Sequence, residues 1–207
     1  MLKPIHREML QLALGDQFST RALEEIMAAN IYQDRVRGQI GHAEYHFDDS
    51  AFEESYAYIE EQRALTISAL MTNEARSAWS AFGRLTHTAQ DFYSHSNYVD
   101  LWLARQPEAA LPSPPEIDPV DPGLLHAPAL HSGKIYLLDY LTAIHPLKPL
   151  LLPLLPHDAH AWMNLDSAER GPKFQYAFHA AVKRTRIEYE KTIKDLPEEI
   201  LRMFLDQ

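Results

Sequence analysis

The stretch from Gly83 to Asn97 constrains the fold of this chain more than any other part of the sequence. It sets His87, Asp91 and His95 four residues apart. Four residues advance about 400° around an α-helix that turns about 100° per residue, so the three side chains share one helical face. Apolar and aromatic residues occupy much of the remaining surface of this helix, which predicts that it is buried. Buried imidazoles and carboxylates need charged partners or a metal ion.

This pattern has two interpretations. A His/Asp pair at helical spacing is most often a hydrogen-bonded cluster or a solvated stripe, since short motifs match by chance. The third residue in register and the apolar surroundings favour a metal site. Imidazole nitrogen and carboxylate oxygen are ligands of Zn²⁺, which is usually four-coordinate, so further ligands must come from elsewhere in the chain.

The rest of the sequence predicts an all-α fold, a single multi-helix domain spanning residues 1–207. Periodic apolar residues predict helices at about 6–14, 19–31, 50–70, 73–105, 172–193 and 195–204, and no stretch shows convincing strand alternation. Ser50 with Glu53 predicts a capping box, and Asn73 is the expected cap of the helix that carries the motif. A chain of 207 residues can bury one large core without disulfides.

Two segments rich in proline interrupt these helices. Residues 107–128 form a predicted loop, and loops of this length often serve as lids or binding loops. Residues 134–155 are strongly apolar, but Pro146, Pro149 and Pro153 exclude an unbroken membrane-spanning helix. We expect a buried helix followed by a packed turn there. The alternative is an apolar rim that contacts lipid acyl chains at a membrane surface.

Composition excludes several classes of function. The net charge is −10 and no cluster of lysine or arginine interrupts it, so stable nucleic-acid binding is not expected. Cysteine is absent, which restricts any metal site to nitrogen and oxygen ligands. No glycine-rich phosphate loop and no GxSxG motif occurs. The first residues lack the features of a secretory signal, which predicts a cytoplasmic protein or export without a cleaved signal peptide.

Further candidate ligands lie outside the central helix. Asp34 and His46 precede it, and a polar group follows at residues 157–166, where His160, Asn164 and Asp166 lie close together. Each group alone is more typical of a surface loop. Helix bundles, however, build multinuclear metal sites from inward-facing side chains on several helices.

Three stretches together resemble a known family. They are His46-Phe47-Asp48, the HTxxDFYxHSN core of residues 87–97, and His160 followed by Met163-Asn164-Leu165-Asp166. They resemble the Het-C-like proteins and, through these, the zinc-dependent phospholipases C and the single-strand-specific zinc nucleases. The resemblance implies an all-α bundle of the phospholipase C type with up to three zinc ions. It assigns Asp34, His46, His87 and Asp91 to one zinc, His95 and His160 with Asp166 or water to a second, and His6 with Asp91 to a third.

The same resemblance predicts a zinc-dependent phosphodiester hydrolase that acts on a phospholipid. Metal-activated water would attack phosphorus, and Asp34 would orient or deprotonate that water. Tyr93 and Asn97 are the candidate substrate-binding residues, and peripheral contact with a membrane is expected. Two alternatives remain open. One is a non-catalytic interaction or toxin module in which zinc is structural and its coordination closed. The other is a single-strand nuclease.

Overall fold

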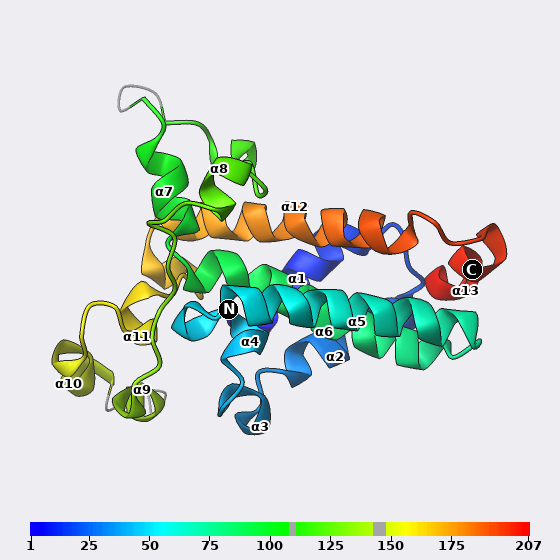
Figure 1. Ribbon diagram of the computed structural model, residues 1–207, viewed down its shortest axis with the longest axis horizontal. Coiled ribbons are helices and arrows are strands. Elements are labelled where there is room, and N and C mark those ends of the chain that lie inside the picture. The colour runs from blue at the N-terminus through cyan, green and yellow to red at the C-terminus, as the bar shows by residue number, and fades with distance from the viewer. Residues whose placement is uncertain (108–110, 143–147) are drawn as a thin grey trace.

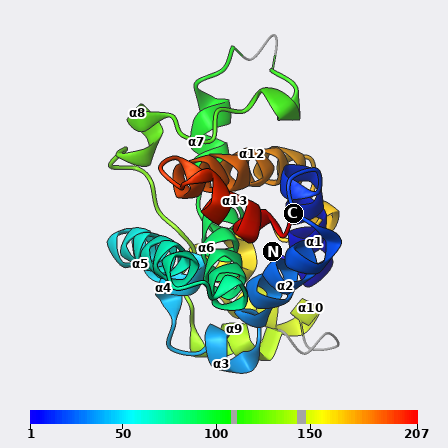
Figure 2. The same cartoon turned by 90° about the vertical axis from the view of Figure 1, so that its right-hand side faces the viewer.

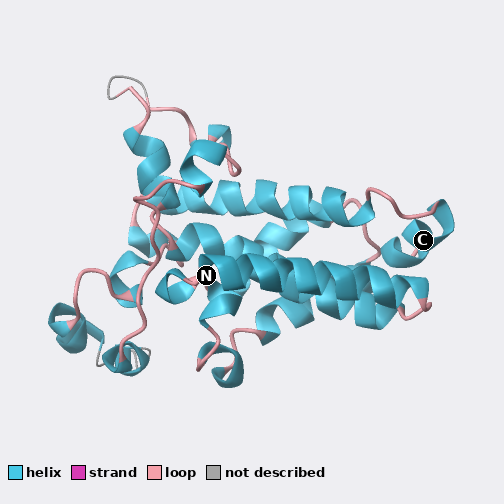
Figure 3. Cartoon of the chain, viewed as in Figure 1, coloured by secondary structure: helices cyan, strands magenta, loops and turns pink. Residues whose placement is uncertain are grey.

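The computed structural model describes residues 1–107, 111–142 and 148–207, and this part of the chain is all-α, which confirms the predicted fold class (Figure 3). Five longer helices form the body, and short helices connect and extend them. The longer ones are α1 (Lys3–Leu14), α2 (Thr20–Tyr32), α5 (Phe52–Met71), α6 (Ala75–His95) and α12 (Lys173–Ile193). The short ones are α3 (Val36–Gln39), α4 (Ala43–His46), α7 (Tyr98–Ala104), α8 (Pro122–Leu125), α9 (Leu137–Thr142), α10 (Lys148–Leu151), α11 (His160–Met163) and α13 (Glu198–Leu205).

Helix α6 lies at the centre of the fold. It packs against α2, α5 and α12, and Figures 1 and 2 show these helices around it. Every residue from Leu85 to His95 is buried, so this half of α6 has no solvent-facing side. The polar side chains of this half must therefore find partners inside the protein.

Gly83 allows α2 and α6 to approach each other closely. A Cβ atom at this position would lie 2.4 Å from the carbonyl oxygen of Ile26 and 2.8 Å from the Cβ of Ala29. Only glycine leaves that space to the neighbouring helix. The contact brings the end of α2, and Asp34 shortly after it, beside the buried half of α6.

The predicted helix over residues 73–105 is broken in the structure. Helix α6 ends at His95, Ser96 is extended with ψ 164°, and α7 starts at Tyr98. Ser96 forms an isolated bridge with Ser132, and the backbone N–H of Asn97 donates to the carbonyl of His131. A returning segment distant in sequence therefore supplies the hydrogen bonds that a continued helix would have made.

Both predicted caps are wrong, and both residues have left-handed backbone. Ser50 has a φ of 56°, and its backbone N–H donates to Ser132 Oγ, so α5 is capped by Ala51 without a side-chain hydrogen bond. Asn73 has a φ of 62° and precedes the actual cap, Glu74. Tertiary contacts and left-handed backbone override the local signal at Ser50.

The described residues of the apolar segment 134–155 form short helices, and several of its leucines are exposed. Residues 143–147, with Pro146 among them, lie outside the described residues. Leu137, Leu150 and Leu154 expose 85%, 70% and 69% of their surface, so the predicted buried helix is wrong. Helices α9 and α10 project from the body at the lower left of Figure 1. In the predicted loop at 107–128, the structure places a 3₁₀ turn at Pro114–Glu116 and helix α8. Among the described residues, no helix combines the length and apolarity needed to cross a bilayer.

Candidate metal centre

Five side chains from four parts of the chain meet beside the buried half of α6. We call them the inner cluster, and they are His6 from α1, Asp34 from the turn after α2, His46 from the end of α4, and His87 and Asp91 from α6. His6, His87 and Asp91 are fully buried, and His46 is nearly so. The predicted first and third metal positions therefore share one group of residues.

Several donor atoms of the inner cluster lie at separations close to those around a four-coordinate metal ion. The Nδ1 atom of His46 lies 3.0 Å from Asp91 Oδ2, and His87 Nε2 lies 3.1 Å from each of these two atoms. Asp34 Oδ1 is 3.9 Å from His87 Nε2. A tetrahedron with bonds of about 2.1 Å has edges of about 3.4 Å. The observed separations lie on either side of that value.

Several polar atoms of the inner cluster are buried without a hydrogen bond. Within the described part of the chain, His6 Nε2, Asp34 Oδ2 and His87 Nδ1 have no hydrogen-bond partner. Buried polar atoms in native proteins are almost always paired with protein, water or an ion. His6 Nε2 lies only 3.3 Å from Asp91 Oδ1 and 4.0 Å from Asp34 Oδ2. A cation between these three atoms would pair His6 Nε2 and Asp34 Oδ2.

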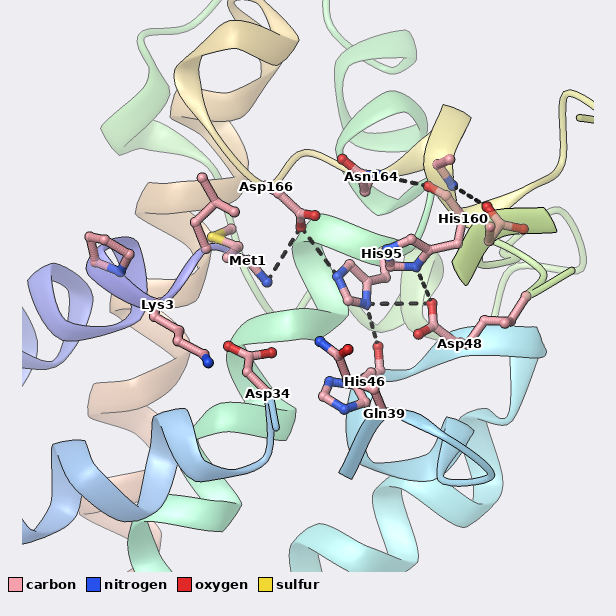
Figure 4. Close-up of a pocket in the computed structure, with 15 residues that line it drawn as sticks. Met1, Lys3, Asp34, Gln39, His46, Asp48, His95, His160, Asn164 and Asp166 are labelled. Carbon is pink, nitrogen blue, oxygen red and sulfur yellow. Dashed lines mark hydrogen bonds and ion pairs between the residues drawn. The ribbon is translucent and has the colours of Figure 1, made fainter. Parts of the chain in front are cut away.

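A second group, the outer cluster, comprises Asp48, His95, His160 and Asp166. His160 Nδ1 lies 2.7 Å from Asp48 Oδ1, and His95 Nδ1 lies 3.5 Å from the same oxygen. His95 Nε2 lies 3.3 Å from Asp166 Oδ1. Figure 4 shows Asp48 and His160 on one side of His95 and Asp166 on the other. The ligand atoms of Asp48, His95 and His160 are close enough to share one ion.

The clusters are connected through the segment 46–48. His46 contributes its ring to the inner cluster, while its backbone carbonyl accepts a hydrogen bond of 2.8 Å from His95 Nδ1. Phe47 has left-handed backbone (φ 56°, ψ 28°), which an aromatic residue rarely adopts. Its ring is 1% exposed and packs against Phe92 and Tyr56, which fixes this conformation. The turn directs Asp48 into the outer cluster.

Asp48 is the site residue that the sequence analysis missed as a ligand. Residues two apart on a helix point to different sides, so His46 and Asp48 do not look like partners in the sequence. Left-handed backbone at a non-glycine residue has no reliable sequence signal. Asn164, in contrast, donates through Nδ2 to the backbone carbonyl of His160 at 2.9 Å and adds a positioning contact.

Negative charge is concentrated at both clusters. The amino group of Met1 donates to Asp91 Oδ1 at 2.5 Å and lies 3.4 Å from Asp166 Oδ1. Burial lowers the pKa of this amino group, but Asp91 and Asp166 outweigh burial and raise it to about 11. Burial likewise disfavours the charged form of His160, yet Asp48 raises its pKa to about 9. The carboxylates of this site therefore stabilise positively charged groups beside them.

His87 differs from the other imidazoles. Its burial lowers its pKa to about 4, and the attraction of Asp91 does not compensate. Its ring is therefore neutral at pH 7 and carries a lone pair on one nitrogen, the form in which histidine binds metal ions.

A cavity of about 600 Å³ opens onto both clusters. Its wall includes Asp34 and His46 of the inner cluster and all four residues of the outer cluster (Figure 4). This volume falls in the range typical of small-molecule sites.

The two predicted substrate-binding residues lie outside this cavity. Tyr93 is fully buried among Phe92 and Tyr98, and its hydroxyl donates to the carbonyl of Pro119. Asn97 binds the loop at residues 129–131 through its side-chain amide. The structure gives both residues contacts that shape the fold.

Comparison with known proteins identifies a family that matches the first half of the chain. Residues 7–116 match the family model described as the VWA7 N-terminal domain. A curated rat protein, von Willebrand factor A domain-containing protein 7, is 35% identical over 101 residues, which cover 47% of this chain and 11% of the rat protein. No solved structure matches the chain.

These matches overturn the predicted family. The family model and the curated relative both correspond to VWA7, and neither corresponds to the Het-C-like proteins or the phospholipases C. The predicted membership is therefore wrong, and the hydrolase, zinc-enzyme and phospholipase C-like labels that came with it lose their support. The matched range contains His46, His87, Asp91 and His95, whereas His6, His160 and Asp166 lie outside it.

Proposed function

This chain belongs to the family of VWA7 N-terminal domains, and we propose that it is a helical domain that binds divalent metal ions. The observation that carries the proposal is the inner cluster, where three donor atoms lie 3.0–3.1 Å apart. Buried imidazole and carboxylate atoms there also lack hydrogen-bond partners among the described residues. Its nitrogen and oxygen ligands suit zinc, which is the ion we would test first.

The charge balance supports the same proposal. Four carboxylates, those of Asp34, Asp48, Asp91 and Asp166, face the two clusters and the cavity. Metal binding would displace protons from the imidazoles beside these carboxylates, as is usual when histidine ligands bind a metal ion.

The experiment is a zinc titration of chelator-treated protein by calorimetry, with the metal content counted by mass spectrometry. Wild type should bind at least one ion per chain, and Asp91→Asn should lose most of this binding because Asp91 contacts His6, His46 and His87. His42→Ala is the matched control, since His42 is 40% exposed and pairs with Glu44 outside both clusters. Equal zinc binding by wild type and Asp91→Asn would contradict the proposal.

A second candidate function is hydrolysis of a phosphodiester at the cavity, and the open cavity beside both clusters favours it. Bound zinc would supply Lewis acidity and lower the pKa of water to about 7. Asp34 lines the cavity, so its carboxylate lies beside the space where an attacking water would be held and is the candidate to accept its proton.

The test uses the zinc-loaded protein with bis(p-nitrophenyl) phosphate and with a dinucleotide. Hydrolysis should require zinc and stop with a chelator. It should fall by at least about 100-fold in Asp34→Asn, the range expected for a general base, in samples whose zinc content matches that of wild type. Full zinc occupancy without hydrolysis of either substrate would instead favour a structural metal in an interaction module.

We propose that the exposed leucines of α9 and α10 make peripheral contact with a membrane. Leu137, Leu150 and Leu154 lie on α9, α10 and the turn after it, which project from the body (Figure 1). Uncharged lipid suits a chain of net charge −10. Leu137→Ser with Leu154→Ser should abolish flotation with phosphatidylcholine vesicles. Met71→Ser, at a methionine on α5 that is 61% exposed, is the control. Flotation that is unchanged in the double variant would exclude this surface.

A further inference from the structure

Gln90 contacts the inner cluster from behind. Its Oε1 lies 2.7 Å from His6 Nδ1, on the side of the imidazole that faces away from Asp34 and Asp91. Both residues are fully buried. The ring of His6 also stacks on His87 at 4.4 Å between centroids, so its plane is fixed.

The orientation of the Gln90 amide follows from Thr185. The Thr185 hydroxyl donates its only hydrogen to the carbonyl of Ala181, at 2.8 Å. Thr185 Oγ1 can then only accept, and it accepts from Gln90 Nε2 at 3.0 Å. With the amide nitrogen facing Thr185, the amide oxygen must face His6.

Asn30 fixes the same orientation from α2. The hydroxyl of Thr86 donates to the carbonyl of Gly83 at 2.9 Å, so Thr86 Oγ1 accepts from Asn30 Nδ2 at 3.1 Å. The same Asn30 nitrogen donates to Gln90 Oε1 at 3.2 Å. Reversing the Gln90 amide would set two NH₂ groups against each other and leave an oxygen facing an oxygen at Thr185.

We propose that Gln90 is a positioning residue that holds His6 in the tautomer with its hydrogen on Nδ1, so that the bare Nε2 faces Asp34 and Asp91 as a metal ligand. Gln90 Oε1 offers only lone pairs, so at 2.7 Å the hydrogen must be on His6 Nδ1. The neutral ring then carries its remaining lone pair on Nε2, which lies 3.3 Å from Asp91 Oδ1. A lone pair and a carboxylate repel each other at this distance, and a metal ion bound by both would remove that repulsion. The role of His6 as a ligand rests on the proposed metal function. The tautomer of His6 rests on hydrogen bonding alone.

The first measurement is made on metal-free protein. Long-range ¹⁵N–¹H NMR correlations identify which ring nitrogen of His6 carries the hydrogen. We expect the hydrogen on Nδ1 in wild type and in Gln90→Glu, because glutamate keeps an acceptor at this position. Gln90→Met removes the acceptor and should lose the preference for Nδ1. Gln33→Met is the matched control, because Gln33 is also a buried amide between α2 and α6 but contacts Arg84 and Thr88.

The second measurement is zinc affinity of the same variants. Outer partners of metal-bound histidines typically contribute about 10- to 100-fold in affinity, so Gln90→Met should weaken binding by that factor and Gln33→Met should not. A hydrogen on His6 Nε2 in wild type, alone or together with one on Nδ1, would overturn the inference. This result needs only wild-type protein, so it holds whether or not Gln90→Met folds. Equal zinc affinity of folded Gln90→Met and wild type would overturn the ligand role. Wild type that shows the Nδ1 tautomer but binds no zinc would refute the metal function and keep the tautomer assignment.

Discussion

Replacing Gly83 with alanine tests the close approach of α2 and α6. Helix propensity alone predicts that this change stabilises the protein, because alanine is favoured over glycine inside a helix by about 1 kcal/mol. The structure predicts the opposite sign. The new Cβ would lie 2.4 Å from the carbonyl oxygen of Ile26, about 1.0 Å inside ordinary van der Waals contact, and a backbone oxygen cannot rotate away.

The magnitude follows from these two opposing contributions. Overpacking of a rigid site costs about 1–3 kcal/mol, and contact with backbone places Gly83→Ala near the upper value. Subtracting the gain in propensity leaves a net loss of about 2 kcal/mol. Separation of the helices would also lengthen the bond of 3.2 Å between Asn30 and Gln90 behind the inner cluster.

Urea unfolding at constant m-value measures this loss. Ala64→Gly, at an exposed position in the middle of α5, gives the propensity contribution for this protein and should cost about 1 kcal/mol. If Gly83→Ala is as stable as wild type or more stable, then α2 and α6 are not in the contact described, and the placement of Asp34 beside α6 is wrong.

Three further predictions concern stability. Glu188 is fully buried between Arg63 and Arg184, and Glu188→Gln should cost about 3–5 kcal/mol at pH 7, measured by urea unfolding. Burial would raise the pKa of Glu188, but Arg184 and Arg63 hold it below its usual value. The stabilisation from Glu188 should therefore decrease as the pH falls below about 4.3, and Glu188→Gln should remove this dependence on acid. Asn73→Gly should stabilise the protein by up to about 1 kcal/mol in the same assay, because Asn73 is exposed with a φ of 62°; a loss would contradict the left-handed assignment. Zinc at 100 times its dissociation constant should add about 2.7 kcal/mol to the stability of wild type and nothing to Asp91→Asn, as measured by calorimetry in zinc and in chelator.

Periodicity alone predicted the centre of the fold. The fourfold spacing of His87 and Asp91 placed them on one face of a buried helix, and the structure places both in the inner cluster. Helical patterns also predicted α1, α2, α5 and α12 to within a few residues, whereas for α6 they predicted the start but not the end at His95. These features depend on contacts within one helix, which the sequence displays directly.

The remaining features depend on contacts between distant segments. Ser96 leaves the helix because Ser132 pairs with it, and Ser50 fails as a cap for a related reason. Gln90 looked like an ordinary residue of the motif, since its importance comes from Thr185, which is 95 residues away. The family prediction failed because short ligand motifs are shared more widely than the families they suggest.

The arrangement of His46 and Asp48 explains why two clusters belong to one centre. A helical turn at Phe47 would send these two side chains in different directions, but its left-handed backbone lets His46 reach Asp91 while Asp48 reaches His160. The cost of this conformation, about 1–3 kcal/mol, must be met by the aromatic core that encloses the Phe47 ring. Packing energy in the aromatic core therefore maintains the geometry of both clusters, and the proposed metal centre depends on the stability of that core.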